Sequence, residues 1–327
     1  MNPEEKLYRR LPELKKLREL ELNKDPLVNF QTLGSVQHKG REYPILSVEI
    51  GSQDKSLPSI GLFGGVHGIE KIGSQVILSF LNTFLQQLRW DEDLRTRMET
   101  CRIVSIPLVN PIGMAYNTRS NGQGVDLMRN APVDSEDEKS PLLVSGHRLS
   151  NKLPWFRGTP EEKMEIESML LCEYVREQCF PSTCHISVDF HSGFGLRDRF
   201  WYPFAKSRED FPRLAEVIAI KKLLDETFPH HIYKVEPQSK VYTTHGDLWD
   251  HLFLQHQEIY GRKHCFMPWT LEMGSWLWLK KNPLQIFNPL GLYNPIKEHR
   301  HERIMRRHLL LINFLLRLTR NPKSWVK

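Results

Sequence analysis

The stretch GLFGGVHGIEKIGSQVILSFL, residues 61–81, begins as an apolar run, breaks at two glycines and then places His67 and Glu70 three positions apart. The apolar run is too short and too uniform for an amphipathic helix, so it predicts a buried strand. Apolar side chains then recur at intervals of four, which predicts a helix from about Gly68 to Arg89. The stretch therefore predicts a strand and a helix with a His-x-x-Glu pair at their junction.

Strand and helix patterns alternate along the rest of the chain. Three more apolar runs predict buried strands: CRIVSIPLV at 101–109, HISVDF at 185–190 and FMPWTLEMG at 266–274. Helical patterns cover about 160–178, with Thr159 as the N-cap, then 211–227 and 297–318. We therefore expect a doubly wound α/β fold, with three α/β/α layers and a central mixed, mostly parallel sheet flanked by helices. In such folds ligands bind beyond the carboxyl ends of the strands.

The N-terminal segment, residues 1–57, precedes the first of these strands. A leucine stripe in the charged stretch 4–22 predicts a helix that packs on the main domain. Two alternating segments, FQTLGSVQHKG and REYPILSVEIGS, meet at Lys39-Gly40 and predict a hairpin. We expect the 327-residue chain to divide into residues 1–57, a helix and hairpin packed on the main domain, and the main domain itself, residues 58–327.

The composition is that of an ordinary globular protein, with 40% hydrophobic and 26% charged residues. The apolar run LLLINFLL at 309–316 is far shorter than the ~20 residues of a membrane-spanning helix. The N-terminus is charged throughout and has no secretory signal, so we expect a cytoplasmic protein with no membrane partner. Five cysteines without C-x-x-C spacing argue against a disulfide framework and against a thiolate zinc site.

The net charge of +6 raises nucleic acid as a possible partner. The basic residues, however, lie in mixed-sign helical segments such as KEHRHERIMRRHLL at 297–310. Such mixed faces are usually just solvated, so we do not expect nucleic-acid binding. The oligomeric state stays open.

A His-x-x-Glu pair alone does not identify a metal site. The chain has 14 histidines, and a second pair occurs at His299 and Glu302. The first pair differs because other predicted strands also end in ligand-type residues, His191 and Glu272. Two histidine nitrogens and one carboxylate leave a position of tetrahedral zinc open for water, as in catalytic rather than structural sites. A further carboxylate could then act as a base.

Several short motifs follow one another along the chain: HGIE (67–70), NPIG (110–113), Arg119, GVDLMRN (124–130), DFHS (189–192) and TLE ending at Glu272. With these motifs in this order the chain resembles the zinc metallocarboxypeptidase family, which is carboxypeptidase A-like and has deacylase relatives. The resemblance covers about residues 58–320 and implies that residues 58–327 are a zinc carboxypeptidase-like catalytic domain. It leaves the N-terminal segment unexplained.

The resemblance implies a ligand set and a general base. His67, Glu70 and His191 would bind Zn²⁺, one ion per chain. Asp126 would accept the outer N–H of His67 and fix its tautomer. Glu272 would take a proton from the attacking water and return it to the leaving amine.

The resemblance also implies substrate contacts. Arg119 would stabilise the oxyanion that develops at the scissile carbonyl, and Arg129 would pair bidentately with a substrate carboxylate. The family usually has Asn before this second arginine, but here the residue is Met128, whose thioether donates no hydrogen bond. Tyr242 resembles the mobile substrate-capping tyrosine of the family, and His245 stands close to it in sequence. Both are candidate substrate-binding residues.

The leading hypothesis is a zinc-dependent hydrolase that cleaves an amide bond next to a free carboxylate, most simply a metallocarboxypeptidase. An alternative is a deacylase of N-acyl amino acids, of the aspartoacylase or succinylglutamate desuccinylase type, which Met128 and the Gly after His67 keep open. The expected partner is accordingly a peptide or an acylated amino acid with a free carboxylate. A third hypothesis, a non-catalytic binding protein on the same fold, is disfavoured by the intact ligand set.

Overall fold

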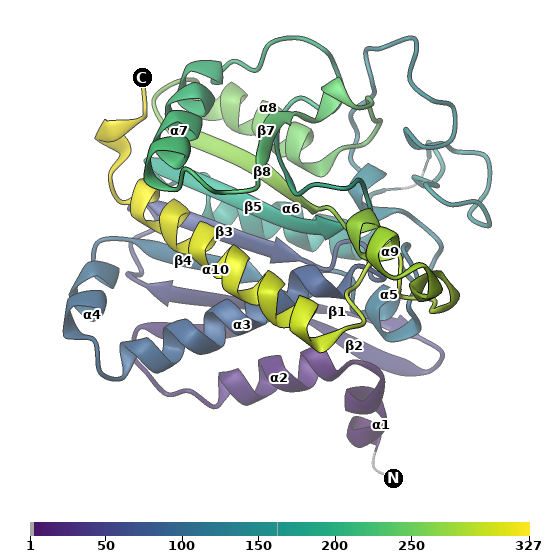
Figure 1. Ribbon diagram of the computed structural model, residues 1–327, viewed down its shortest axis with the longest axis horizontal. Helices are drawn as coiled ribbons and strands as arrows, with labels where there is room; N and C mark the ends of the chain where they lie inside the picture. Colours follow the sequence, from purple (N-terminus) through teal and green to yellow (C-terminus); the bar gives the residue numbers. More distant parts are fainter. Residues whose placement is uncertain (1–2, 162) are drawn as a thin grey trace.

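One eight-stranded sheet, ordered β1-β2-β4-β3-β5-β8-β6-β7, organises the computed structural model, which describes residues 3–161 and 163–327 (Figure 1). The strands are β1 (Val28–His38), β2 (Arg41–Gly51), β3 (Ser59–Gly64), β4 (Arg102–Ile106), β5 (Cys184–Ser192), β6 (Arg199–Tyr202), β7 (Lys234–Pro237) and β8 (Cys265–Met273). The central strands β4, β3, β5 and β8 run parallel. Strand β2 pairs antiparallel with both β1 and β4, and β6 pairs antiparallel with β8 but parallel with the edge strand β7. The predicted mixed, mostly parallel sheet is confirmed.

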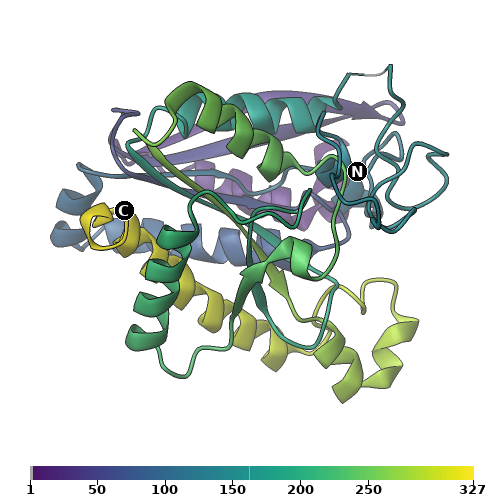
Figure 2. The same cartoon turned by 90° about the horizontal axis from the view of Figure 1, so that it is seen from above.

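Helices cover both faces of the sheet. The α-helices are α1 (Pro3–Arg10), α2 (Pro12–Glu21), α3 (Lys71–Leu88), α4 (Glu92–Met98), α5 (Pro111–Tyr116), α6 (Ile166–Gln178), α7 (Leu214–Thr227), α8 (Leu248–Tyr260), α9 (Trp276–Lys281) and α10 (Glu298–Thr319). Short 3₁₀ turns are η1 (Leu127–Arg129), η2 (Gln238–Lys240), η3 (Pro283–Phe287) and η4 (Pro322–Ser324). Figure 2 shows α3, α7 and α10 on one face and α6 and α8 on the other, which confirms the three layers.

The N-terminal segment differs from its prediction in one respect. The stretch 4–22 forms two helices, α1 and α2, because Pro12 has no N–H to donate and Leu11 leaves helical geometry at φ −131°. The chain turns between β1 and β2 at Lys39 and Gly40, which both have positive φ, as two-residue hairpin turns require. Strand β2 then pairs with β4 in the main sheet.

The helix expected over 160–178 begins later, at Ile166, with Glu165 rather than Thr159 at the N-cap position. The Glu165 backbone N–H donates to the Asn130 side chain at 2.6 Å. This bond holds the chain extended before the helix and ties it to the segment that follows η1. Position 162, within the predicted helix, lies outside the described residues.

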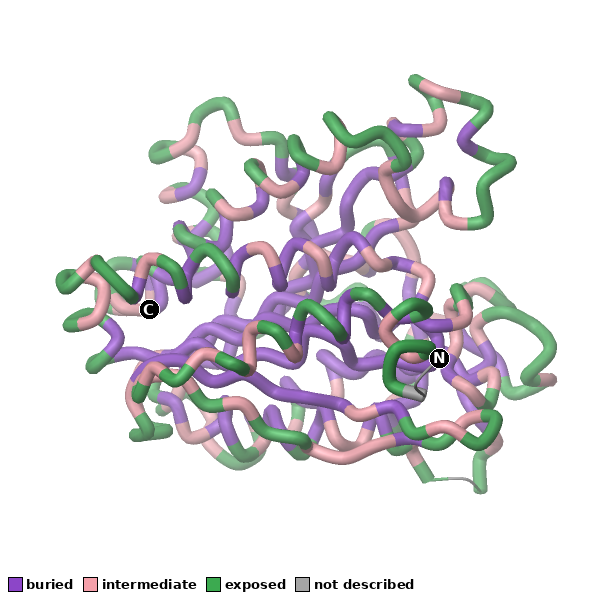
Figure 3. The backbone as a smooth tube through the Cα atoms, turned by 90° about the horizontal axis from the view of Figure 1, so that it is seen from below, coloured by how far each residue is buried: buried purple, intermediate pink, exposed green. Residues whose placement is uncertain are grey.

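Buried strands at the centre of the sheet position the site. Every residue of β3, β5 and β8 is buried, and Figure 3 shows the buried positions running along the strands while exposed positions follow the outer helices and loops. In the parallel register Gly64 of β3 lies opposite Phe190 of β5, and His191 opposite Glu272 of β8. The carboxyl ends of three neighbouring strands therefore deliver their polar side chains to one edge.

None of the helices in the described ranges combines the length and the apolar character needed to cross a bilayer.

Candidate metal centre and active-site cavity

The His-x-x-Glu turn follows directly from the end of β3. Gly65 has a φ of +68°, and a Cβ there would lie within 2.8 Å of two neighbouring side chains. Gly68 packs so closely on the NPIG turn that a Cβ would lie 2.0 Å from the carbonyl carbon of Gly113. Glycine is needed at both positions, so the two motifs lock together and bring His67 and Glu70 over the strand ends.

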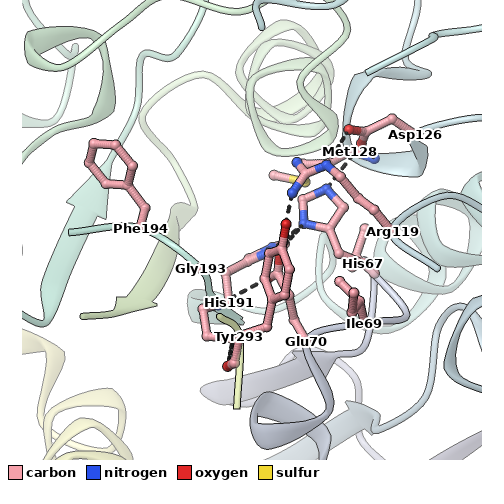
Figure 4. Close-up of polar contacts among 12 residues, drawn as sticks. His67, Ile69, Glu70, Arg119, Asp126, Met128, His191, Gly193, Phe194 and Tyr293 are labelled. Atoms are coloured by element: carbon pink, nitrogen blue, oxygen red, sulfur yellow. Dashed lines mark hydrogen bonds and ion pairs between the residues drawn. The ribbon is translucent and has the colours of Figure 1, made fainter. Parts of the chain in front are cut away.

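Three buried side chains from two segments of the chain converge here (Figure 4). The Nδ1 atom of His67 lies 3.0 Å from Glu70 Oε1 and 3.1 Å from His191 Nδ1. His191 Nδ1 in turn lies 3.1 Å from Glu70 Oε2, so the ligand-type atoms all lie within 4.8 Å of one another. Among the residues that the structure describes, these three form the one group of three or more with metal-ligand geometry, and we call them the ligand group.

Two aspartates fix the outer nitrogens of the histidines. Asp126 Oδ1 lies 3.0 Å from His67 Nε2, as predicted, and Asp189 Oδ2 lies 2.8 Å from His191 Nε2. Each carboxylate accepts an Nε2–H, so the Nδ1 lone pairs face inward. Asp189 also accepts the indole N–H of Trp249 at 2.9 Å. Sequence reasoning assigned no role to Asp189, although its Asp-x-His spacing puts both side chains on one face of β5.

Asp126 joins the two predicted arginines to the ligand group. Its Oδ2 atom accepts from Arg119 Nε at 2.9 Å and from Arg129 Nη1 at 3.3 Å. Arg119 Nη1 also donates to Glu70 Oε1 at 3.2 Å. Burial would raise the pKa of Asp126, but the two guanidinium groups and His67 hold it well below its usual range. The carboxylate is therefore ionised and fixes three of the predicted site residues at once.

Burial and neighbouring charges shift the pKa values of the ligand group in opposite directions. Burial alone would raise the pKa of Glu70, but His67 and His191 beside it hold that pKa below its usual range. Burial would likewise lower the pKa of His191, but Asp189 and Glu70 raise it well above its usual value. A cluster of inward-facing nitrogens and an ionised carboxylate is the donor set that zinc prefers, and it leaves room for a further ligand.

The ligand group forms part of the wall of an open cavity of about 690 Å³. Glu272 lies in the same wall, and its Oε1 accepts the backbone N–H of Phe194 at 3.0 Å. Burial and the neighbouring Glu70 carboxylate raise the pKa of Glu272 to about 8. A cation bound at the ligand group would act in the opposite direction and favour the ionised form. The pKa of Glu272 therefore depends on whether the ligand group holds a cation.

The remaining candidates divide between the cavity and its surroundings. Arg119, Arg129 and Tyr242 line the cavity, and the Tyr242 ring lies 6.2 Å from the ring of Phe194. His245 is not among the lining residues that the structure describes. Its Nδ1 atom accepts the backbone N–H of Ser135 at 3.1 Å instead, so its substrate-binding role stays a prediction.

Met128 is buried on η1 beside Arg129. Its backbone N–H donates to Asp126 Oδ1 at 3.2 Å. The thioether therefore occupies the place of the usual Asn without supplying its hydrogen bond.

Comparisons with known proteins agree with this geometry. A family model described as "Zinc carboxypeptidase" matches residues 14–275. Carboxypeptidase SOL1 of Arabidopsis thaliana is 27% identical over 93 residues, which is 28% of this chain but only 19% of that protein. The match thus spans about a fifth of the relative's length.

Solved structures are similar in fold. Bovine thrombin-activatable fibrinolysis inhibitor, solved with a tick carboxypeptidase inhibitor, has a TM-score of 0.67 at 15% identity, over 94% of this chain and 96% of that chain. Carboxypeptidase A from Helicoverpa armigera has a TM-score of 0.56 at 16% identity, over 91% of this chain and 71% of that chain. At these identities the likeness shows the fold, whereas the family model covers most of the chain. The chain belongs to the zinc carboxypeptidase family.

Proposed function

We propose that the protein is a zinc-dependent hydrolase of the metallocarboxypeptidase type, which cleaves the amide bond next to a free carboxylate. One zinc ion per chain would be held by His67, Glu70 and His191. The observation that carries the proposal is the convergence of these three buried side chains at 3.0–3.1 Å beside a cavity that Glu272 also lines. The catalytic domain would comprise residues 58–327, with residues 1–57 packed against it.

Zinc, when bound, supplies a Lewis acid that polarises a carbonyl and makes water more acidic. Glu272 is the base of the proposal: it removes a proton from the attacking water and returns it to the leaving amine. Its position in β8, opposite His191 of β5, places the carboxylate one strand from the ligand group. The hydrogen bond from the Phe194 backbone N–H holds Oε1 of this carboxylate in place at the cavity wall.

Two arginines would bind the charged parts of the substrate. The hydrogen bonds recorded among the described residues use Nε and Nη1 of Arg119 and the same two atoms of Arg129. None of these bonds uses Nη2 of either guanidinium, and both side chains line the cavity. Arg119, beside Glu70, would stabilise negative charge on the scissile carbonyl oxygen. Arg129 would hold the terminal carboxylate, and Tyr242 would close over it.

The experiment that tests the proposal compares two peptides of one sequence, with a free or an amidated C-terminus. We expect release of the last residue only from the free form, complete loss of activity after chelation, and recovery on adding zinc. Cleavage of both forms at equal rates would contradict the role of the free carboxylate.

The deacylase alternative is not favoured by the family match. N-acyl amino acids belong in the same assay: turnover of these compounds with peptides left untouched would reverse the order of the two hypotheses. A binding protein without catalysis would retain metal and cleave neither. The cytoplasmic compartment and the absence of nucleic acid as a partner stay predictions.

A further inference from the structure

Residues 276–297, the projecting segment, run from α9 through η3 to the start of α10. They form a lobe that extends from the body of the molecule, drawn in yellow-green in Figure 2. The tip of the lobe exposes Leu284, Ile286 and Phe287, which are 74%, 65% and 83% accessible. Single exposed apolar residues are ordinary, but three within four positions form a patch that favours contact with an apolar partner.

The tip is held in this exposed arrangement by internal hydrogen bonds. Gln285, buried between the exposed side chains, donates from Nε2 to the carbonyl oxygens of Gly291 at 2.6 Å and Asn294 at 3.0 Å. Asn294 accepts the backbone N–H of Ile72 at 2.9 Å and donates to the carbonyl oxygen of Ile69 at 2.8 Å. The lobe is therefore tied to the His-x-x-Glu turn, and its apolar side chains point outward from a braced loop.

The projecting segment is also basic. It contains Lys280, Lys281 and Lys297, all exposed, and the sequence has no Asp or Glu from 273 to 297. Of the carboxylates in the described part of the chain, none forms a recorded ion pair with these lysines. An apolar tip flanked by unpaired lysines has the chemistry of segments that lie in the headgroup region of a bilayer.

We propose that the projecting segment docks on an anionic lipid surface. Leu284, Ile286 and Phe287 enter the boundary between headgroups and acyl chains, and the lysines contact headgroup phosphates. A second copy of the chain fits less well, because a twofold contact would set the lysines against their own counterparts. The substrate fits less well too, since the cavity lining within the described residues includes Trp276 and Tyr293 but none of the three tip side chains.

Docking would bring the cavity close to the membrane surface, because Trp276 and Tyr293 belong both to the projecting segment and to the cavity wall. The expectation of no membrane partner came from the lack of a spanning run and of a secretory signal, and neither is needed for contact of this kind. The proposal concerns binding and does not depend on the proposed hydrolysis. Its failure would leave the metal site and its activity standing.

Flotation of the full chain with vesicles tests the proposal. The probes are vesicles of phosphatidylcholine alone and of equal parts phosphatidylcholine and phosphatidylglycerol, in about 0.1 M NaCl. We expect binding to the mixed vesicles, weaker binding to phosphatidylcholine alone, and release at about 1 M NaCl. Equal binding to both vesicle types, or to neither, would overturn the proposal.

Matched variants locate the contact. Ile286→Asp with Phe287→Asp should weaken binding roughly tenfold or more. The control pair, Ile259→Asp with Trp90→Asp, changes residues of similar exposure, 63% and 70%, outside the projecting segment and should bind like the wild type. Because each lysine near an anionic surface contributes roughly fivefold, Lys280→Gln with Lys281→Gln should also weaken binding.

All variants should have the circular dichroism spectrum and the melting temperature of the wild type, which shows that they fold whether or not the protein proves to be a hydrolase. A tip variant that binds vesicles as well as the wild type would refute the proposal. So would vesicle-free self-association in sedimentation that the tip variant abolishes, because the patch would then be an interface between copies.

Discussion

The chain contains two His-x-x-Glu pairs, and the structure gives them opposite surroundings. His67 and Glu70 are buried at the end of β3, with His191 3.1 Å away. His299 and Glu302 are exposed at the start of α10, where Glu302 accepts a surface hydrogen bond from Arg306 at 3.3 Å. In the described part of the chain the second pair belongs to no group of three ligand-type residues.

The difference shows what a metal site requires beyond spacing. A spacing of three residues on a turn brings the His and Glu side chains together. Burial of their charges costs free energy, however, unless other elements supply polar partners. The first pair has a third ligand-type side chain from β5, and a carboxylate contacts the outer nitrogen of each imidazole. These carboxylates are Asp126, at the N-cap of η1, and Asp189, on β5. The second pair stays in water, where no such partners are needed. Substitutions at the first pair's surroundings and at the second pair test this contrast.

The largest effect is expected at Glu272, the base of the proposed mechanism. Glu272→Gln preserves size and should retain the metal, but it removes the proton acceptor. We expect kcat to fall by about 10³ or more, within the range attributed to general base catalysis. Steady-state kinetics beside metal analysis checks this, and full activity in a metal-loaded variant would remove Glu272 from the mechanism.

Asp126 should come second, because it accepts from His67 and from both arginines. An amide at this position offers a single oxygen and no charge, so Asp126→Asn should weaken zinc binding roughly 10–100-fold. It should also raise KM, since Arg119 and Arg129 lose their shared partner. Competition with a chelator measures the first effect, and unchanged affinity would show that the His67 tautomer is fixed by another group.

Asp189→Asn provides the matched comparison, because Asp189 serves His191 but neither arginine. We expect weaker zinc binding, by roughly tenfold, with KM close to the wild-type value once zinc is saturating. The two aspartates are thus distinguished by KM, which should rise in Asp126→Asn but not in Asp189→Asn, although both variants should bind zinc more weakly. A KM change as large as that of Asp126→Asn would mean that Asp189 affects the substrate cavity directly.

The smallest effect is expected at the second pair. His299→Ala combined with Glu302→Ala changes two exposed side chains, so activity should stay within about twofold and the melting temperature nearly constant. Loss of activity in this double variant would contradict the distinction between the two motifs.

Much of this arrangement could be predicted from the sequence. Long apolar runs identified the central strands, and the polar residues at their ends identified the three residues that the structure groups as possible metal ligands. Local patterns were weaker where tertiary contacts decide. The four-residue strands β6 and β7 and the helix α8 were not predicted, and the α6 start depends on a side chain of the distant segment after η1.

The direction in which a side chain points could not be predicted from the sequence either. Tyr242 and His245 are close in sequence, yet one lines the cavity and the other contacts Ser135. The role of Asp189 depends on Trp249 and His191, which meet only after β5 and α8 pack together. The projecting segment could not be predicted from hydrophobic periodicity. Its apolar residues follow no repeating pattern, and their exposure depends on the hydrogen bonds that Gln285 makes within the loop.

The most direct measurement is the zinc content of three purified proteins: the wild type, His191→Ala and His299→Ala. His191 is buried beside the first His-x-x-Glu pair, whereas His299 belongs to the second pair and is exposed on α10. The account predicts about one zinc per chain in the wild type and in His299→Ala, and almost none in His191→Ala. Full zinc in His191→Ala, or loss of zinc in His299→Ala, would contradict it.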